Sequence, residues 1–516
     1  MTLTPGTSHV PGVGAIAETF HRSLTAQFLN RAADPDYFKW INHIESSAGC
    51  SAPVRLHGNI HHVEASTGRI VRSVDTRTMP DAALYVACGN RRSVVCPSCS
   101  ETYRGDTFQL VRAGLVGGKG VPETVVNHPC VFLTLTAPSF GPVHTSSVTR
   151  SGKPRPCRPR RTPDTCPHGA VLACTQVHAD ADPCVGTPLC GRCYDYPGHV
   201  VWNAFAGELW RRTTITANRA LKALGDSLDN SPGASLRLSY AKVAEYQRRG
   251  LVHFHALIRL DGWHDPDEPG AIMAPDPAVT VEHLVQLLTT AAETTSFRTE
   301  PHPRRREGWS VGWGTQIDTR IVRLAPGDLD TKGEVTTTAV AAYLAKYATK
   351  ATEATGFASA RLTPETIRLY ADPTTHMGRV VRACWSLGRR PRTLTTPEER
   401  EAWNAGYGRL RRWAHMLGFG GHFSTKSRRY STTLGALRAA RRDWQRTQHT
   451  TPPATGPVDN EHQADTDDSI VIISDLVFAG MGWHTTADAV LANSSAARAR
   501  EKRQVAREEM TALIGG

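Results

Sequence analysis

Two neighbouring segments have the pattern of paired β-strands, and they constrain the fold more than any other feature of the chain. They are RLSYAKVAEYQ (Arg237–Gln247) and LVHFHALIRL (Leu251–Leu260), and the three residues between them end in Gly250. A three-residue connection with glycine in the left-handed position is typical of a β-hairpin. The spacing predicts an antiparallel pair in which Glu245 lies directly opposite His253.

His253 and His255 fall on one face of the second strand, because successive strand side chains point to opposite faces. The predicted register adds Glu245 to the same face. Two imidazoles and a carboxylate form a ligand set for a divalent cation such as Mg²⁺ or Mn²⁺, with room left for substrate oxygens. Gln247, diagonal to His253 on this face, is the alternative third ligand. The plain structural alternative is a hydrogen-bonded pair of core histidines.

A helix is predicted in TTTAVAAYLAKYATKATEAT, and four of its side chains share one stripe: Tyr343, Lys346, Tyr347 and Lys350. Taken alone, this pattern indicates an amphipathic surface helix. Beside a metal site the same stripe indicates phosphodiester cleavage, because a tyrosine can attack a phosphate that a metal polarises while a lysine stabilises the negative charge. The products are a tyrosyl phosphodiester and a free 3′-hydroxyl.

Twelve cysteines in one chain favour metal sites, and two C-x2-C pairs support that interpretation. We expect two structural zinc ions, with free buried cysteines as the alternative. The first predicted ligand set is Cys50, Cys88, Cys96 and Cys99. The second is Cys166, Cys174, Cys190 and Cys193, with His168 or His178 as substitutes.

The net charge of +12 is concentrated in one region. Arg382–Arg446 contains 15 Lys and Arg against 4 Asp and Glu, nearly the whole excess. A polyanion such as nucleic acid explains this patch, and a solvated basic surface is the alternative. The candidate DNA contacts are Arg428, Arg429, Arg441 and Arg442.

The N-terminal sequence MTLTPGTSHVPGVGAIAETF lacks the basic start and apolar core of a signal peptide, and the chain has no run of 18 apolar residues. We therefore expect a cytoplasmic protein without a membrane partner.

Three motifs occur in the order FLTLT (Phe132–Thr136), HFH (His253–His255) and YLAKYATK (Tyr343–Lys350). In this order they resemble the motifs of HUH endonucleases that initiate rolling-circle replication. Four longer segments, CSAPVRLHG, EYQRRGLVHFHALIRLDG, VAAYLAKYATKATE and KSRRYSTTLGALRAAR, are similar to the replication initiators of actinomycete plasmids and integrative conjugative elements. The similarity extends over most of the chain.

The resemblance implies an α+β fold, in which an antiparallel nuclease sheet of the ferredoxin-like or palm type carries helices on one side and zinc-ribbon-like cysteine insertions. It implies metal binding at His253 and His255 and nucleophilic attack by Tyr347. In related one-tyrosine initiators the position four residues earlier is a glutamate that activates water, whereas here it is Tyr343. We expect an exchange between two tyrosines, with a packing role for Tyr343 as the alternative.

Origin DNA, both duplex and single-stranded, is the partner that this resemblance implies. The chain contains no G-x-x-x-x-G-K-[ST] loop, so a host helicase and DNA polymerase are expected to separate and copy the strands. A rolling-circle transposase uses the same order of motifs and is the first alternative. A non-catalytic zinc-ribbon DNA-binding protein is the second, and conjugative relaxases fit less well because their tyrosine usually precedes the histidines.

Five regions are expected along the chain. They are an N-terminal region with the first cysteine group (1–125), a nuclease domain (126–355) with a cysteine-rich insert at about 142–198, a basic helical region (356–446), a linker (447–469) and a small C-terminal unit (470–516) without an assigned function.

Overall fold

The computed structural model describes most of the chain and divides it into two compact units. One unit comprises Met1–Tyr103 with Trp444–Gly516, and the other comprises Arg104–Asp443. The predicted linker falls almost wholly outside the described residues. The described residues are 13–47, 49–149, 151–228, 236–262, 271–322, 337–348, 361–449, 470–494, 497, 498 and 501.

A five-stranded antiparallel sheet forms the centre of the second unit. Its order is β10 (Ile317–Ile321), β5 (Cys130–Leu135), β7 (Val252–Gly262), β6 (Leu236–Tyr246) and β11 (Ser424–Lys426). Strands β6 and β7 form the predicted hairpin, and Glu245 pairs with His253 as expected. Gly250 ends the connection with a φ of +80°, a conformation that suits glycine better than any residue with a side chain. The predicted hairpin register is confirmed.

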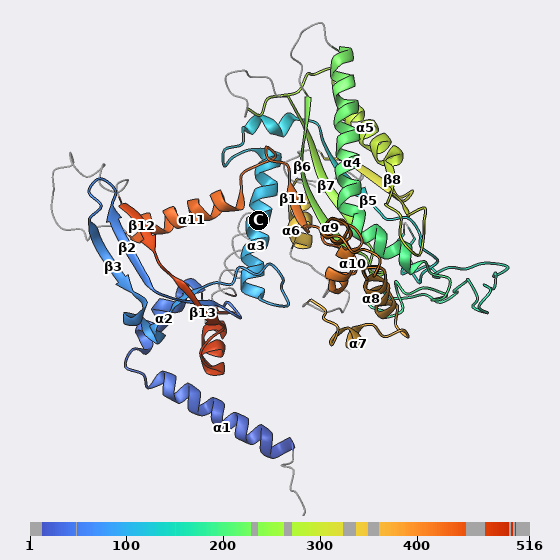
Figure 1. The fold of residues 1–516 in the computed structure, drawn as a ribbon. Coiled ribbons are helices and arrows are strands. Elements are labelled where there is room, and N and C mark those ends of the chain that lie inside the picture. The colour runs from blue at the N-terminus through green and yellow to red at the C-terminus, as the bar shows by residue number, and fades with distance from the viewer. Residues whose placement is uncertain are drawn as a thin grey trace, which may run out of the picture. The chain divides into compact units, whose positions relative to one another are not determined.

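The long helix α4 (Tyr196–Leu228) covers the apolar face of this sheet (Figure 1). Its Trp210 packs edge-on against Phe254 of β7, with the ring centroids 6.1 Å apart. Helix α5 (Val281–Thr294) lies along α4 and contacts β5 and β10. Because side chains alternate along a strand, His253 and His255 project from the other face, which α6 (Thr337–Ala348) meets.

The rest of the second unit adds two short strands and several helices. Helix α8 buries Val380, Val381 and Cys384 in the same apolar cluster as the sheet and α4, because its apolar side chains lie on one face. The basic helical region therefore shares a core with the sheet, which differs from the predicted boundary at residue 356. These elements are α3 (Pro97–Val116), β8 (Ser296–Arg298), β9 (Ser310–Gly312), α7 (Ile367–Tyr370), α8 (His376–Leu387), α9 (Pro397–Ala405), α10 (Gly408–Arg412) and α11 (Leu434–His449), with α3 and α11 each continuing into the first unit.

The first unit combines the two ends of the chain. Besides α1 (Val13–Ala32) and α2 (Tyr37–Ile44), it contains two small antiparallel sheets, in which the C-terminal strands β12 and β13 pair with β2 and β1. Blue and red strands accordingly lie side by side in Figure 1. The described residues from 470 onward are thus part of this unit, whereas the sequence pattern indicated a unit of their own. One sheet has the order β13 (Val477–Met481), β1 (Val54–His57) and β4 (Leu84–Val86). The other has the order β12 (Ile470–Ser474), β2 (Asn59–Glu64) and β3 (Ile70–Asp75).

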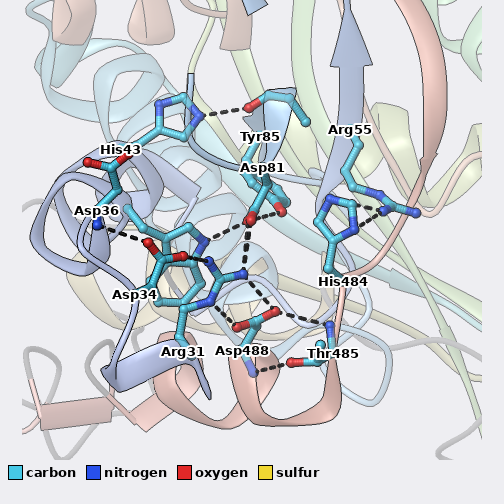
Figure 2. Close-up of polar contacts among 12 residues, drawn as sticks. Arg31, Asp34, Asp36, His43, Arg55, Asp81, Tyr85, His484, Thr485 and Asp488 are labelled. Carbon is cyan, nitrogen blue, oxygen red and sulfur yellow. Dashed lines mark hydrogen bonds and ion pairs between the residues drawn. The ribbon is translucent and has the colours of Figure 1, made fainter. Parts of the chain in front are cut away.

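Arg31 joins the N-terminal and C-terminal segments of the first unit (Figure 2). Its guanidinium contacts Asp488 at 2.6 Å and Asp81 at 3.0 Å. Asp81 also accepts hydrogen bonds from the Trp40 indole and the Tyr85 hydroxyl, both at 2.8 Å. Because these polar side chains are largely buried, the loss of one of them leaves several of the others without a hydrogen-bond or ion-pair partner.

Arg31→Ala is expected to lower the free energy of unfolding by about 3 kcal/mol, because it leaves Asp81 and Asp488 without their cation. Lys39→Ala is the matched control, since Lys39 pairs with Asp36 on the surface and its side chain is 76% exposed. Its loss is expected to change the free energy of unfolding far less than the loss of Arg31. Urea unfolding measures both values, and equal effects of the two substitutions would contradict this role for Arg31.

Lys242 of β6 is buried on the apolar face, with its ammonium 3.9 Å from the centroid of the Phe254 ring. Burial lowers its pKa from 10.5 to about 7. Between pH 7 and pH 10.5 the folded chain binds fewer protons than the unfolded chain, so the free energy of unfolding rises with pH in this range. Below pH 7 the full cost of burying the charged lysine is present.

Lys242→Met is therefore expected to raise the free energy of unfolding by about 3 kcal/mol near pH 6 and by about half of that or less near pH 9. The smaller gain at high pH arises because the unprotonated lysine already fits the apolar site at a lower cost. Urea unfolding at the two pH values measures the difference. An equal gain at both pH values would show that the lysine is buried without a change in its pKa.

Candidate functional site

The three predicted metal ligands come together on the face of the sheet that α6 meets. The carboxylate Oε2 of Glu245 lies 3.2 Å from Nε2 of His253 and 3.5 Å from Nε2 of His255. All three ligand atoms lie within 4.8 Å of one another. Gln247, the alternative ligand, instead accepts a hydrogen bond from Nε of Arg249 at 2.9 Å. The structure therefore favours Glu245 over Gln247 as the third ligand.

His255 is oriented by two residues of β5. The Thr134 hydroxyl lies 3.0 Å from its Nδ1, and Phe132 stacks on the ring at a centroid distance of 5.6 Å. A partner on Nδ1 leaves Nε2 for Glu245 and for a metal. Burial lowers the pKa of His255, so this imidazole remains neutral to a lower pH than an ordinary histidine. A neutral imidazole is the form that binds metals.

The donor set of this cluster fits a divalent cation. Its carboxylate oxygen suits hard ions such as Mg²⁺ and Mn²⁺, and its two imidazoles suit the ions of the first transition series. With only three protein ligands, such an ion keeps positions for oxygens from elsewhere. The side chains of Glu245 and His253 are each 16% exposed, so the cluster is accessible from solvent.

Helix α6 brings Tyr343 to this cluster. Its hydroxyl lies 3.1 Å from Nε2 of His255, and the two rings meet edge-on with their centroids 5.1 Å apart. Lys346 lies one turn further along the helix and is exposed. The backbone of Tyr347 belongs to α6, but its side chain and all of Lys350 lie outside the described residues. The tyrosine helix and the histidine strand are thus neighbours.

The first cysteine group contains the four predicted ligands, Cys50, Cys88, Cys96 and Cys99. Their sulfurs lie 3.7 Å apart for Cys88 and Cys99 and 3.8 Å apart for Cys50 and Cys99. Four thiolates bound to zinc at about 2.3 Å are about 3.8 Å apart, so the arrangement fits a tetrahedral zinc ion. The hydrogen bond between Cys99 and Cys50 lowers the pKa of Cys50 and raises the pKa of Cys99, so Cys50 is the first of the two to form a thiolate.

The second cysteine group differs from the predicted set in one ligand. Cys166, Cys190 and Cys193 converge with His168, whose Nδ1 lies 3.2 Å from the sulfur of Cys193. Cys174 lies elsewhere, because the backbone around it pairs with Arg158 in an antiparallel bridge. His168 is one of the two predicted substitutes, and it takes the place of Cys174 in this ligand group. The prediction of Cys174 as a ligand of this group is thereby corrected. A Cys3His set also fits tetrahedral zinc.

The four candidate DNA-contacting arginines differ in their surroundings. Arg428 and Arg442 are exposed, and Arg429 is half-buried. Arg441 forms an ion pair with Asp106, whose side chain is only 2% exposed. Arg441 therefore contributes to the stability of the second unit, because it neutralises the buried carboxylate of Asp106.

The sequence comparisons identify the family of the chain. Residues 36–497 match the RepSA family, described as "Replication initiator protein, pSAM2". The chain belongs to this family of replication initiators. A protein of Streptomyces ambofaciens named "Replication initiator protein" is 39% identical over 483 residues, which cover 93% of this chain and 94% of that relative. No solved structure matches the chain. The predicted resemblance to replication initiators is confirmed.

Asp318 of β10 is a site residue that the sequence did not reveal. It pairs with Thr134 in the sheet and so lies on the same face as His255. Its negative charge is one of the influences that raise the pKa of His255 against the larger effect of burial. The alternating pattern of TQIDTRIVRL indicated a strand, but only the pairing of β10 with β5 places Asp318 beside the cluster.

Among the described residues, no helix combines the length and the apolar character needed to cross a membrane.

Proposed function

We propose that this member of the initiator family nicks one strand of its origin DNA by transesterification onto a tyrosine. The observation that carries the proposal is the convergence of Glu245, His253 and His255 with the tyrosine helix, where the Tyr343 hydroxyl lies 3.1 Å from Nε2 of His255. A nucleophile-bearing helix beside a three-ligand cation site is an arrangement suited to phosphodiester cleavage.

Glu245, His253 and His255 would hold the cation, and Thr134 and Phe132 would fix the orientation of His255. A bound Mg²⁺ or Mn²⁺ would polarise the scissile phosphate as a Lewis acid. The Tyr347 oxygen then forms a bond to phosphorus while the bond from phosphorus to the 3′-oxygen breaks. The phenolic proton is lost and the leaving 3′-oxygen gains one, which yields a 5′-phosphotyrosine and a free 3′-hydroxyl. Lys346 and Lys350 would stabilise the negative charge of the phosphoryl oxygens or the phenolate.

Tyr343 is proposed to serve as the second nucleophile. Its hydroxyl already lies beside the ligand atoms of the cluster, which places it near the proposed position of the phosphate. A second tyrosine can accept a new strand while the first returns its phosphoryl group to a 3′-hydroxyl. Because each step exchanges one phosphodiester for another, the closing reaction needs no ATP.

Origin DNA is the proposed substrate, with the basic region around Arg428 and Arg442 as a contact to the duplex. A host helicase and polymerase would then extend the 3′-hydroxyl. The name of the Streptomyces ambofaciens relative, "Replication initiator protein", favours an origin over the transposon ends used by a rolling-circle transposase.

Nicking of a supercoiled plasmid that carries the DNA beside the coding region tests this proposal. Wild type is expected to produce nicked circles with Mg²⁺ or Mn²⁺ and none after brief chelation with EDTA, whereas duplex binding persists in EDTA. Restoring activity with Mg²⁺ alone is the control, because it shows that tightly bound zinc was retained. Duplex binding without nicking under any condition would favour a zinc-containing DNA-binding protein instead.

A further inference from the structure

A third group of metal-binding side chains lies in the insert between β5 and α4, and no predicted ligand set contains it. His144, Cys157, Cys174 and His178 have ligand atoms within 4.8 Å of one another. Cys157 and His178 are buried, and the rings of the two histidines meet edge-on at a centroid distance of 5.2 Å. Two thiolates and two imidazoles are a closed tetrahedral set that zinc prefers.

His178 is held as a metal-binding histidine is usually held. Its Nδ1 lies 2.9 Å from a carboxylate oxygen of Asp182, while its Nε2 lies 3.4 Å from the sulfur of Cys174. A carboxylate on one ring nitrogen orients the other nitrogen toward a metal. The sulfur of Cys184 lies 3.3 Å from Nδ1 and 3.8 Å from Nε2 of His178, and it groups with His178 and Asp182 rather than with His144, Cys157 and Cys174.

A bound metal would order the insert, whose described residues between β5 and α4 form no helix or strand. They contain isolated bridges only, such as Val143 with Pro188 and Arg158 with Cys174. Small regions without regular structure and without an apolar core are commonly ordered by a metal or by disulfides. The cysteines in question are free thiols.

We propose that His144, Cys157, Cys174 and His178 bind a third zinc ion, which shapes a DNA-binding pocket beside the nuclease site. The pocket has a volume of about 550 Å³ and includes His144 and Arg158 in its wall. Arg158 follows the ligand Cys157, and Arg248 donates a hydrogen bond to the backbone carbonyl of Asp182 at 3.2 Å. A zinc ion bound here, with Asp182 in contact with its ligand His178, would therefore order the part of the pocket wall that carries Arg158 and Arg248.

The position and charge of the pocket suit a single strand that leaves the nuclease site. Gln247 lines it, directly after the end of β6 and two residues beyond Glu245, a spacing of about 7 Å along an extended chain. Arg158, Arg248 and Arg249 line it together with Asp180 as the one acidic residue. Arginine recognises phosphates and stacks on bases. This part of the proposal rests on the proposed nicking function, and it assigns to the pocket a nucleotide next to the scissile phosphate.

Zinc analysis of the purified full chain tests the third site. Wild type is expected to contain three zinc ions per chain, and Cys157→Ser two, whereas Cys184→Ser keeps three. Cys157→His supplies an equivalent donor and is expected to restore the third ion, which separates loss of a ligand from loss of folding. Two ions in the wild type, or loss of an ion in Cys184→Ser but not in Cys157→Ser, would overturn the assignment.

Single-strand binding tests the pocket, with fluorescein-labelled oligonucleotides tiled across the DNA beside the coding region as probes. In EDTA-free buffer without Mg²⁺, Arg158→Ala and Arg248→Ala are expected to weaken binding of the tightest probe about tenfold each. Arg160→Ala is the matched control, since Arg160 pairs with Asp164 on the surface of the same insert. It is expected to change affinity less than about twofold.

Covalent adduct formation at saturating oligonucleotide separates the two proposals. The pocket variants are expected to form the adduct once the DNA is saturating, because Tyr347 and the cation ligands are intact. Unchanged affinity in both arginine variants would overturn the pocket while the nicking function stands. Absence of an adduct in the wild type itself would overturn the nicking function.

Discussion

Replacement of Tyr347 by phenylalanine is expected to abolish the covalent adduct between the protein and the 5′ end of the nicked strand. The substitution removes only the attacking oxygen, so at least a ~10³-fold loss is expected while DNA binding persists. A denaturing gel of reactions with a radiolabelled origin strand measures the adduct. Tyr370→Phe is the matched control, because this tyrosine lies in α7, outside the cluster, and its loss should leave adduct formation unchanged.

Tyr343→Phe is expected to give a different result in the same assay. The first adduct should still form, but the closed product of the exchange should be lost, because the second phenolic oxygen is missing. The substitution also removes the contact to Nε2 of His255. If Tyr343→Phe abolished the adduct and Tyr347→Phe did not, the roles of the two tyrosines would be reversed. Normal closing by Tyr343→Phe would indicate the packing role instead.

Glu245→Gln is expected to reduce nicking about 10³-fold, a loss of about 4 kcal/mol of transition-state stabilisation. The change keeps the size of the side chain but removes the negative charge that lies between the two histidines. The Mn²⁺ concentration that gives half-maximal nicking should rise at the same time. Titration of nicking with Mn²⁺ measures both effects.

Glu293→Gln provides the control for this substitution, since Glu293 is exposed on α5, which packs along α4 and not against α6 or the histidine face of the sheet. It should behave as the wild type. His253→Ala and His255→Ala should resemble Glu245→Gln, whereas all three variants keep their affinity for duplex DNA. A Glu245→Gln variant with wild-type dependence on Mn²⁺ would contradict the assignment of Glu245 as a ligand.

The sequence predicted the site best where local geometry determines it. The three-residue loop ending in Gly250 fixes the register that places Glu245 opposite His253, and side-chain alternation then places His255 beside them. The same holds for Cys96 and Cys99, because a C-x2-C pair is itself a local geometry.

Contacts between distant segments were less predictable. The C-x2-C pair of Cys190 and Cys193 does not specify which distant residue completes its set, and the chain brings His168 there instead of Cys174. The pairing of β12 and β13 with strands more than 400 residues earlier likewise depends on hydrogen bonds between distant backbones. Asp318 joins the cluster for the same reason, through the pairing of β10 with β5.

Mass spectrometry of the adduct tests the central claim most directly. Wild-type protein is reacted with a single strand that carries the nick site, digested with nuclease and protease, and searched for peptides that retain a nucleotide. The expected product is a phosphodiester bond between a 5′-nucleotide and Tyr347 in a peptide from α6. A nucleotide on a residue outside α6, or cleaved DNA without any linked peptide, would contradict tyrosine transesterification at this site.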